Sequence, residues 1–199
     1  ILNWSIALEG GQVALIRYTL DVRGSARAPD VAALDAQIER MVRGWVPAVE
    51  AALASEAGDA RATRLALKFA NSFPNGYRIT STPEEAALDI LSIAELEDEA
   101  ARSVRIAHDP AHAGSLRVKL YRLGGPLPLS DAVPVFENFG FRVIEEVPTA
   151  LSDDARAYVH DFGVTLAGGT LRGDIGTLQA AIDAVLEGRA ENDAFNRLI

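Results

Sequence analysis

Residues 115–187 decide the fold, and they read SLRVKLYRLGGPLPLSDAVPVFENFGFRVIEEVPTALSDDARAYVHDFGVTLAGGTLRGDIGTLQAAIDAVLE. Runs rich in β-branched and aromatic residues, which favour strands, alternate here with runs whose apolar residues are three or four apart, which favour helices. The predicted elements are a strand at 116–123, a helix starting at Ser130, strands at 141–147 and 157–166, and a helix starting at Asp174. Ser130 and Asp174 are expected to cap their helices, because their side-chain oxygens can accept a backbone N–H of the first turn.

This β-α-β-β-α order is that of a ferredoxin-like sandwich without its last strand. Two upstream segments could complete the sheet. A strand at 103–107 can form a hairpin with 116–123, and Gly10-Gly11 predicts a separate hairpin at 4–22. We expect both to join one continuous, mostly antiparallel sheet, because an isolated hairpin is only marginally stable in water.

Helices are predicted between these strand regions. An apolar stripe predicts a long helix over 30–56 that Pro47 kinks or divides, followed by helices at 59–72 and after the capping residue Thr82. The chain is therefore predicted to be an α+β protein in two parts. Residues 1–101 form a β-hairpin plus a helical segment, and residues 102–199 form an α/β sandwich. Four apolar residues are expected in the core of the sandwich: Phe136, Val143, Phe162 and Ile182.

The composition excludes several classes of protein. The 19 Lys and Arg residues face 28 Asp and Glu residues, and this net charge of −9 argues against nucleic-acid binding. The absence of cysteine excludes disulfides, thiolate metal sites and cysteine nucleophiles. The sequence contains no run of 18 apolar residues, so no membrane-spanning helix is predicted. Because the chain starts at Ile1 and stops inside a predicted helix, we expect a piece of a longer protein. No signal-like segment precedes an apolar stretch at its start, and we expect a cytoplasmic location.

The histidines and lysines do not predict a catalytic or metal site. A proline lies between His108 and His112, so these residues are expected in a polar loop rather than as paired ligands on a helix. His160 alternates with apolar residues and is expected to be a hydrogen-bonded core histidine. Lys119 alternates with Arg117 along a strand, which favours a solvated sheet face or an edge.

The acidic residues and glycines give the same result. Seven acidic residues fall between Glu84 and Glu99 without a basic residue, and we expect a solvated face there. Glu145 and Glu146 are adjacent on a strand and point to opposite faces, so they cannot act as a carboxylate pair. No dinucleotide-binding or phosphate-binding glycine motif occurs. Residue chemistry alone therefore predicts no catalytic, cofactor-binding or metal-binding residue.

Several longer motifs point to a known family. They are PLPLSDAVPVFENFGFRVIEE at 126–146, YVHDF at 158–162, GRAENDAFNRL at 188–198, FPNGY at 73–77 and TPEEAALDI at 82–90. In their order along the chain they resemble the very large bacterial NAD-specific glutamate dehydrogenases, and the resemblance extends over residues 65–199.

The resemblance implies oxidative deamination of L-glutamate to 2-oxoglutarate, with NAD as cofactor of the parent enzyme. It also implies that the substrate and nucleotide sites lie beyond Leu198, so no catalytic residue can be carried over to this fragment. The fragment would then be a noncatalytic regulatory or assembly segment that contains a unit like the ACT domain, an amino-acid-binding regulatory module.

Two roles stay open for such a segment. As a binding module it would hold an amino-acid effector near Gly124, Gly125, Ser130 and Asp131, where free N–H groups favour a carboxylate. As a structural module it would join the remainder of the polypeptide and a homo-oligomer. We favour the structural role, because Arg122 is the only basic residue beside that turn.

Overall fold

The computed structural model describes residues 3–9, 13–19, 30–32, 44–110, 112, 114–152, 155–166 and 174–198. Contacts divide the chain into two compact units, Ile1–Val42 and Arg43–Ile199, which are considered separately. The predicted division after residue 101 stays a prediction.

The first unit contains the predicted hairpin. Strands β1 (Asn3–Glu9) and β2 (Val13–Thr19) pair antiparallel, in register from Asn3 opposite Thr19 to Glu9 opposite Val13. The hairpin is confirmed, but the single continuous sheet is wrong, because β1 and β2 form a two-stranded sheet of their own. The two strands pair with each other along their whole length, so each has its partner within the hairpin and needs no strand of the other sheet for this pairing.

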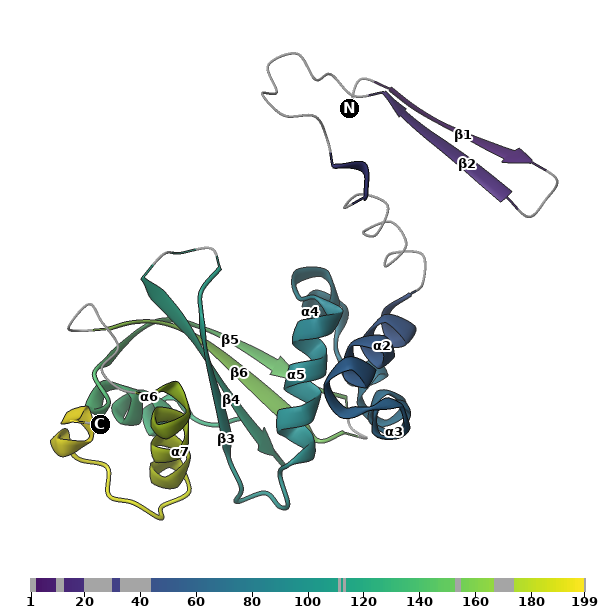
Figure 1. Ribbon diagram of the computed structural model, residues 1–199. Coiled ribbons are helices and arrows are strands. Elements are labelled where there is room, and N and C mark those ends of the chain that lie inside the picture. Colours follow the sequence, from purple (N-terminus) through teal and green to yellow (C-terminus); the bar gives the residue numbers. More distant parts are fainter. Residues whose placement is uncertain are drawn as a thin grey trace. The chain divides into compact units, whose positions relative to one another are not determined.

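The second unit is an α+β assembly, as predicted (Figure 1). Its helical segments are α2 (Trp45–Ala57), α3 (Asp59–Phe69), the short 3-10 turn Ala70–Ser72, α4 (Asn75–Thr80), α5 (Pro83–Ala94), α6 (Leu129–Asn138), α7 (Ile175–Leu186) and a 3-10 turn at Ala194–Leu198. Its strands are β3 (Ser103–His108), β4 (Ser115–Leu123), β5 (Phe141–Ala150) and β6 (Ala157–Leu166).

The four strands form an antiparallel sheet in the order β3-β4-β6-β5. In a ferredoxin-like sandwich the strand that follows the last helix lies beside the first strand. Here β3 takes that outer position beside β4, although it comes before β4 in the chain. The predicted hairpin between 103–107 and 116–123 is therefore confirmed, and it completes the sheet.

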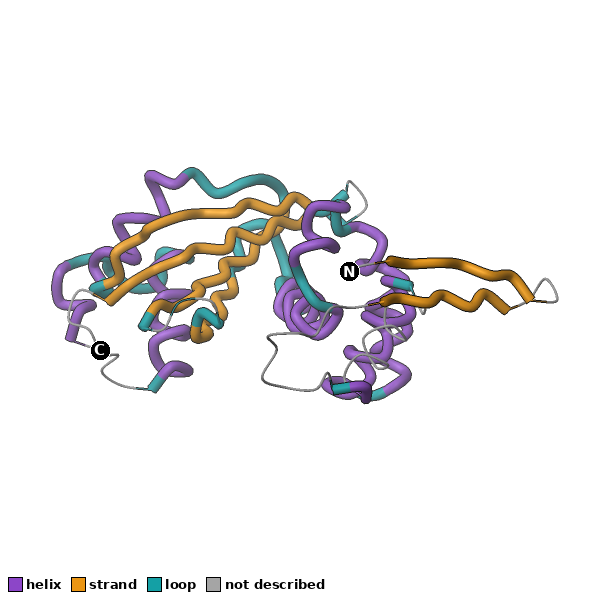
Figure 2. Tube along the Cα trace, turned by 90° about the horizontal axis from the view of Figure 1, so that it is seen from above, coloured by secondary structure: helices purple, strands orange, loops and turns teal. Residues whose placement is uncertain are grey.

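Helices cover both faces of this sheet. Figure 1 shows α6 and α7 on one side and α5, with α2 and α3 beyond it, on the other, and Figure 2 shows the same layers from above. On the α6–α7 side, the rings of Phe136 and Phe162 meet edge to face with centroids 4.9 Å apart. Phe136, Phe162 and Ile182 are fully buried as predicted, whereas Val143, on the edge strand β5, is only half-buried. The other side has a second apolar core that extends into α2, α3 and α5.

Helix starts show where local signals succeeded and failed. Thr82 and Asp174 cap α5 and α7 as predicted, each accepting a backbone N–H three residues later. Ser130 does not cap α6, because the helix begins one residue earlier, after Pro128. The predicted helix over 30–56 is observed from Trp45 onward, and residues 33–43 lie outside the described residues.

The helix boundaries determine what the prolines do to the helical hydrogen bonds. Pro47 lies in the first turn of α2, where its missing N–H breaks no helical hydrogen bond. Pro134, in a first-turn position if the helix started at the predicted cap Ser130, is the sixth residue of α6 in the structure, so its missing N–H leaves the carbonyl of Ser130 without its helical donor. The helical segment predicted over 59–72 ends at Ser72 in the structure, whereas α4, which begins at Asn75, was not predicted.

Candidate functional site

A buried ion cluster joins the helices to the sheet. Its centre is the carboxylate of Asp89 on α5, which is completely buried. Four side chains donate to it: Tyr77 from α4, Arg105 from β3, and Lys119 and Tyr121 from β4. The tyrosine hydroxyls lie 2.6 and 2.8 Å from Asp89, the Arg105 guanidinium 2.9 Å, and the Lys119 ammonium 2.8 and 3.1 Å from its two oxygens.

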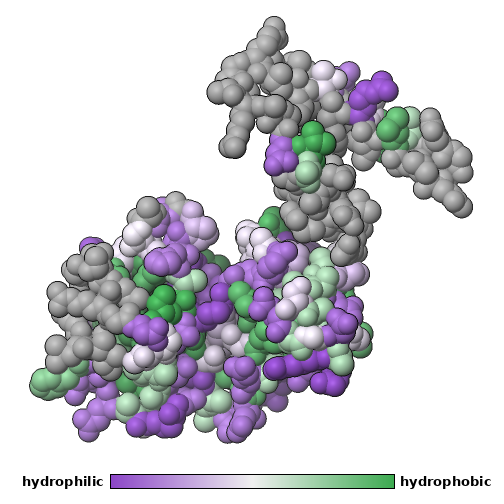
Figure 3. All heavy atoms as spheres, viewed as in Figure 1, coloured by the Kyte–Doolittle hydropathy of each residue, from purple (hydrophilic) through white to green (hydrophobic). Residues whose placement is uncertain are grey.

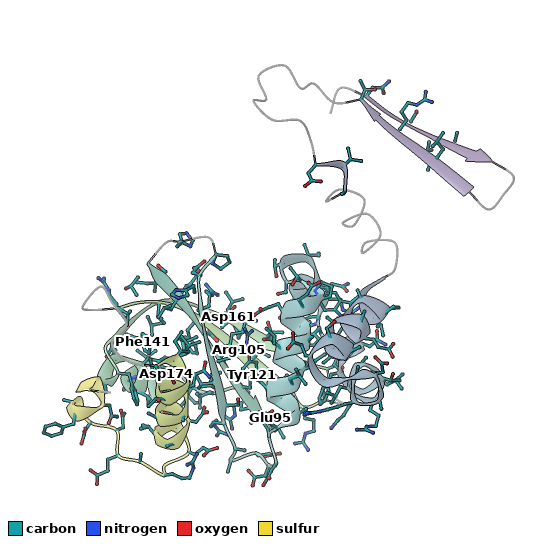
Figure 4. The ribbon with its side chains drawn as sticks, in the orientation of Figure 1. Glu95, Arg105, Tyr121, Phe141, Asp161 and Asp174 are labelled. Atoms are coloured by element: carbon teal, nitrogen blue, oxygen red, sulfur yellow. The ribbon has the colours of Figure 1, made fainter. Side chains whose placement is uncertain are left out.

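Glu85 completes the cluster one helical turn before Asp89. It bonds to the guanidinium of Arg105, and its Oε1 lies 2.6 Å from Nζ of Lys119. Glu85 and Asp89 are four residues apart on α5, so they share one face of the helix. Lys119 stands opposite Arg105 in the β3–β4 register, so these two cations share one face of the sheet. Figure 4 labels Arg105 and Tyr121 on the strands beside α5.

Two expectations are overturned here. Lys119 is only 5% exposed, so it lies neither on a solvated sheet face nor at an edge. The acidic run at 84–99 is not wholly a solvated face either, because Asp89 is buried and Glu85 partly so. The physical reason is the same for both: α5 covers this sheet face, and the opposite charges compensate one another as the helix excludes water.

The cluster shifts the pKa values of its members in consistent directions. Burial, followed by the charge of Asp89, raises the pKa of both tyrosine hydroxyls, so Tyr77 and Tyr121 remain protonated donors. Burial alone would lower the pKa of Arg105, but its contacts with Tyr121, Asp89 and Glu85 outweigh burial and raise it. Burial alone would raise the pKa of Glu85, but Lys119 and Arg105 outweigh it and lower the pKa.

This arrangement stabilises the fold rather than carrying out acid–base chemistry. Two carboxylates balance two cations, and both oxygens of Asp89 already accept hydrogen bonds. A group that transfers protons to a substrate needs an accessible position within hydrogen-bond reach, and Asp89 has no solvent access. The cluster therefore holds α4 and α5 on the sheet, and we call these six residues the lock: Tyr77, Glu85, Asp89, Arg105, Lys119 and Tyr121.

A cleft of about 500 Å³ opens beside this lock. One wall is formed by the α4 segment, and the floor by β4, β5 and β6. Its lining residues are Pro74, Gly76, Tyr77, Thr80, Ser81, Arg117, Lys119, Val147, Pro148, Thr149, Val159 and Asp161. Tyr77 and Lys119 thus belong both to the cleft and to the ion cluster.

A second cleft of about 510 Å³ lies between the end of α5 and α7. Among its lining residues are five acidic ones, Glu95, Glu97, Asp98, Asp183 and Glu187, and two arginines, Arg102 and Arg189. Burial, followed by the charge of Glu187, raises the pKa of Asp183 to about 7. No group of three or more His, Cys, Asp or Glu side chains in the described part of the chain is arranged to hold a metal ion.

The sequence-predicted effector residues lie elsewhere. Gly124 has a φ of 88° and donates its N–H to the carbonyl of Arg156 at 2.8 Å. Ser130 and Asp131 are exposed, and the hydroxyl of Ser130 donates to the Asp131 carboxylate at 3.2 Å. Neither cleft is lined by these residues or by Gly125. Their role in effector binding stays a prediction.

The histidines have structural partners. His160 is buried and hydrogen-bonded, as predicted: its Nε2 accepts the N–H of Leu127 at 3.1 Å, and its Nδ1 lies 2.8 Å from Glu146. Because Nε2 is an acceptor, these partners assign the ring proton to Nδ1, which donates to Glu146. His112 is exposed and contacts Asp109 within its own loop.

Sequence comparisons identify the family. The model for the glutamate dehydrogenase ACT3 domain matches residues 102–178, and the model for glutamate dehydrogenase helical motif 2 matches residues 52–96. Together these ranges cover more than half of the chain. The chain belongs to the NAD-specific glutamate dehydrogenase family. The ion cluster therefore joins two motifs of this family, since Tyr77, Glu85 and Asp89 lie in one matched range and its other members in the next.

The similar proteins are much longer than this chain. An NAD-specific glutamate dehydrogenase from Pseudomonas aeruginosa is 34% identical over 196 residues, which are 94% of this chain and 12% of that protein. The one from Halomonas elongata is 32% identical over 203 residues, covering 99% of this chain and 13% of that protein. The one from Mycobacterium tuberculosis is 28% identical over 145 residues, covering 67% and 9%. The chain thus spans about an eighth of the length of the first two relatives.

The drawn surface of the second unit is mainly hydrophilic. In the view of Figure 3, hydrophilic side chains dominate the drawn face of the second unit, with isolated hydrophobic patches between them. Within the described residues, no helix combines the length and the apolar character that crossing a membrane requires.

Proposed function

We propose that this chain is a noncatalytic assembly segment of a larger parent enzyme. The parent is a cytoplasmic NAD-dependent glutamate dehydrogenase, which deaminates L-glutamate oxidatively to 2-oxoglutarate. The observation that carries the proposal is the buried lock at Asp89. It joins the helical motif and the ACT3 sandwich into one compact unit. A rigid unit of this kind suits a part that positions the remainder of the polypeptide, or a second subunit of a homo-oligomer.

The experiment places Asp89→Asn in the full-length enzyme, with Glu84→Gln as the matched control. Glu84 is an exposed carboxylate on the same helix and lies outside the cluster. We expect Asp89→Asn to reduce the assembled fraction in size-exclusion chromatography and to reduce the activity in proportion. The remaining assembled enzyme should keep its KM for glutamate and NAD, and the control should resemble the wild type. A changed KM in intact oligomers would contradict an assembly role.

The second candidate function is an amino-acid-binding sensor of the ACT type that controls the enzyme allosterically. The match to the ACT3 model favours it, and so does the start of α6, where no side chain caps the helix. Its site would be at Gly124, Gly125, Ser130 and Asp131. Removing the Ser130 hydroxyl with Ser130→Ala in the full-length enzyme should then weaken the response of activity to amino acids.

A further inference from the structure

The cleft between α4 and the sheet has the features of a small-molecule site. Its volume of about 500 Å³ falls within the range of ligand pockets, which is about 300–1,000 Å³. Its floor carries a cation and a carboxylate, Arg117 and Asp161, which are 20% and 25% exposed. Apolar side chains, including Val147 and Val159, lie beside these charges. Figure 4 labels Asp161 on the sheet.

The guanidinium of Arg117 is held in one orientation. Its Nε donates to Oδ1 of Asp161 at 2.9 Å, and its Nη1 donates to Oε1 of Glu145 at 2.5 Å. Gly163 makes this possible: a Cβ at that position would come within 2.9 Å of Cγ of Glu145 and 3.1 Å of Nη1 of Arg117. The missing side chain thus leaves room for the Arg117–Glu145 bridge across β6.

These bonds use only two of the five N–H groups of Arg117 and one oxygen of Asp161, so both side chains keep hydrogen-bonding capacity. Within the described residues, Nη2 of Arg117 and Oδ2 of Asp161 have no hydrogen-bond partner. A guanidinium N–H is a strong donor to a carboxylate, and a carboxylate oxygen is a strong acceptor for an ammonium group. These two atoms belong to side chains that bond to each other, so a ligand that satisfies both needs an anionic and a cationic group close together, as on the two sides of a single carbon.

We propose that this cleft binds a small zwitterion, a free α-amino acid, with its carboxylate toward Arg117 and its ammonium group toward Asp161. The inference deepens the second candidate function and rests on it, but it places the effector in the cleft instead of at the turn around Gly125. The hydroxyls of Thr80, Ser81 and Thr149 line the cleft and supply further hydrogen-bonding groups. The apolar residues beside them accommodate the side chain of the ligand.

The location gives such a ligand a way to influence the enzyme. Tyr77 and Lys119 line the cleft and also bond to Asp89 in the buried lock. A bound amino acid therefore contacts two groups that hold the helices on the sheet. Its binding energy would stabilise the locked arrangement over any arrangement in which α4 has moved away.

Two glycines allow the site to be tested by filling space. Gly76 lines the cleft, and a Cβ built on it meets no atom within 4 Å. Gly125 is equally open, lies at the alternative turn and does not line the cleft. Gly76→Leu should therefore block the cleft and Gly125→Leu the turn, without a steric clash at either Cβ. Asp161→Asn keeps an acceptor for Arg117 but removes the charge that the ammonium group requires.

The experiment measures hydrogen exchange by mass spectrometry in the full-length enzyme, with and without each standard amino acid at millimolar concentration. We expect at least one amino acid to slow exchange in the peptides covering 74–81 and 147–161. Gly76→Leu should abolish this protection, Gly125→Leu should retain it, and Asp161→Asn should weaken binding at least about tenfold. Acetate and methylamine, which each carry half of the zwitterion, should give no comparable protection.

Three results would overturn the inference: no amino acid protects these peptides, Gly76→Leu leaves the protection intact, or acetate alone reproduces it. Protection that is lost in Gly125→Leu but not in Gly76→Leu would place the effector at the turn, which refutes the cleft and retains the sensor function. An enzyme whose activity responds to no amino acid other than its substrate glutamate would refute the sensor function itself. Assembly that depends on Asp89 is a separate result and would survive either failure.

Discussion

Replacing Asp89 tests the lock most directly. Asp89→Asn keeps the size of the side chain but removes its charge, and it turns one acceptor into an N–H donor that faces other donors. In the wild type, both oxygens of Asp89 accept from Tyr77, Arg105, Lys119 and Tyr121 at 2.6–3.1 Å. The substitution leaves Arg105 and Lys119 with Glu85 as their remaining carboxylate in the cluster.

The structure sets the size of the expected effect. Removing one partner from a buried ion pair costs about 3–5 kcal/mol, because the other charge stays buried without compensation. Asp89 is completely buried and Lys119 nearly so, so screening by water does not reduce this figure. We therefore expect Asp89→Asn to lower the free energy of unfolding by about 3–5 kcal/mol.

The assay is urea unfolding of the 199-residue chain, followed by circular dichroism. A double-mutant cycle with Lys119→Met separates the pair from its surroundings, because the double variant no longer buries the unpaired ammonium. The double variant should cost less than the sum of the single variants by at least about 1 kcal/mol. The reasoning is refuted if Asp89→Asn costs less than about 1 kcal/mol, or if the two costs add within about 0.5 kcal/mol.

The remaining predictions concern the sandwich and the parent activity. Phe136→Ala and Phe162→Ala should each cost about 3–5 kcal/mol in the same assay, and a loss below about 1 kcal/mol would contradict their place in the core. Burial and Glu187 raise the pKa of Asp183 to about 7, so its stabilising contribution is complete at acidic pH and is lost as the pH rises through about 7. Asp183→Asn should therefore gain stability relative to the wild type between about pH 5 and about pH 8, and an unchanged difference between the unfolding midpoints would refute this. The 199-residue chain alone should reduce no NAD with glutamate, since it contains no predicted nucleotide-binding βαβ unit, and turnover by a contaminant-free sample would refute that.

Elements with strong local signals were predictable from the sequence. The strand predicted at 157–166 has those bounds in the structure, because alternating apolar residues and the glycines that follow define it locally. The caps at Thr82 and Asp174 were predictable for the same reason, since each cap needs only residues of its own first turn. Ser130 had the same local signal, but Pro128 occupies the cap position of α6 instead.

The lock was not predictable in this way because its parts are distant in the sequence. Asp89 and Lys119 are thirty residues apart and meet only when α5 lies on the sheet. Charged residues that alternate on a strand normally indicate a solvated face, and this rule fails where a second charged element covers that face. A signal was nevertheless present: Glu85 and Asp89 share a helix face, while Arg105 and Lys119 could be paired once the hairpin was predicted. Complementary charge between two predicted faces would have suggested the contact.

The outer edge of the four-stranded sheet, at β3, is protected from pairing with a further strand. An exposed strand edge invites pairing with another chain, and α7 covers this one with side chains four residues apart. Gln179 accepts the N–H of Ile106 at 2.9 Å, and Glu187 accepts the N–H of Arg102 at 3.0 Å. Between them, the backbone N–H of Val104 donates a hydrogen bond to the carboxylate of Asp183. The spacing matches because four residues of a helix rise about 6 Å and two residues of a strand about 6.6 Å. Another strand could join here only by displacing these side chains, so the edge at β5 is the one left for extending the sheet.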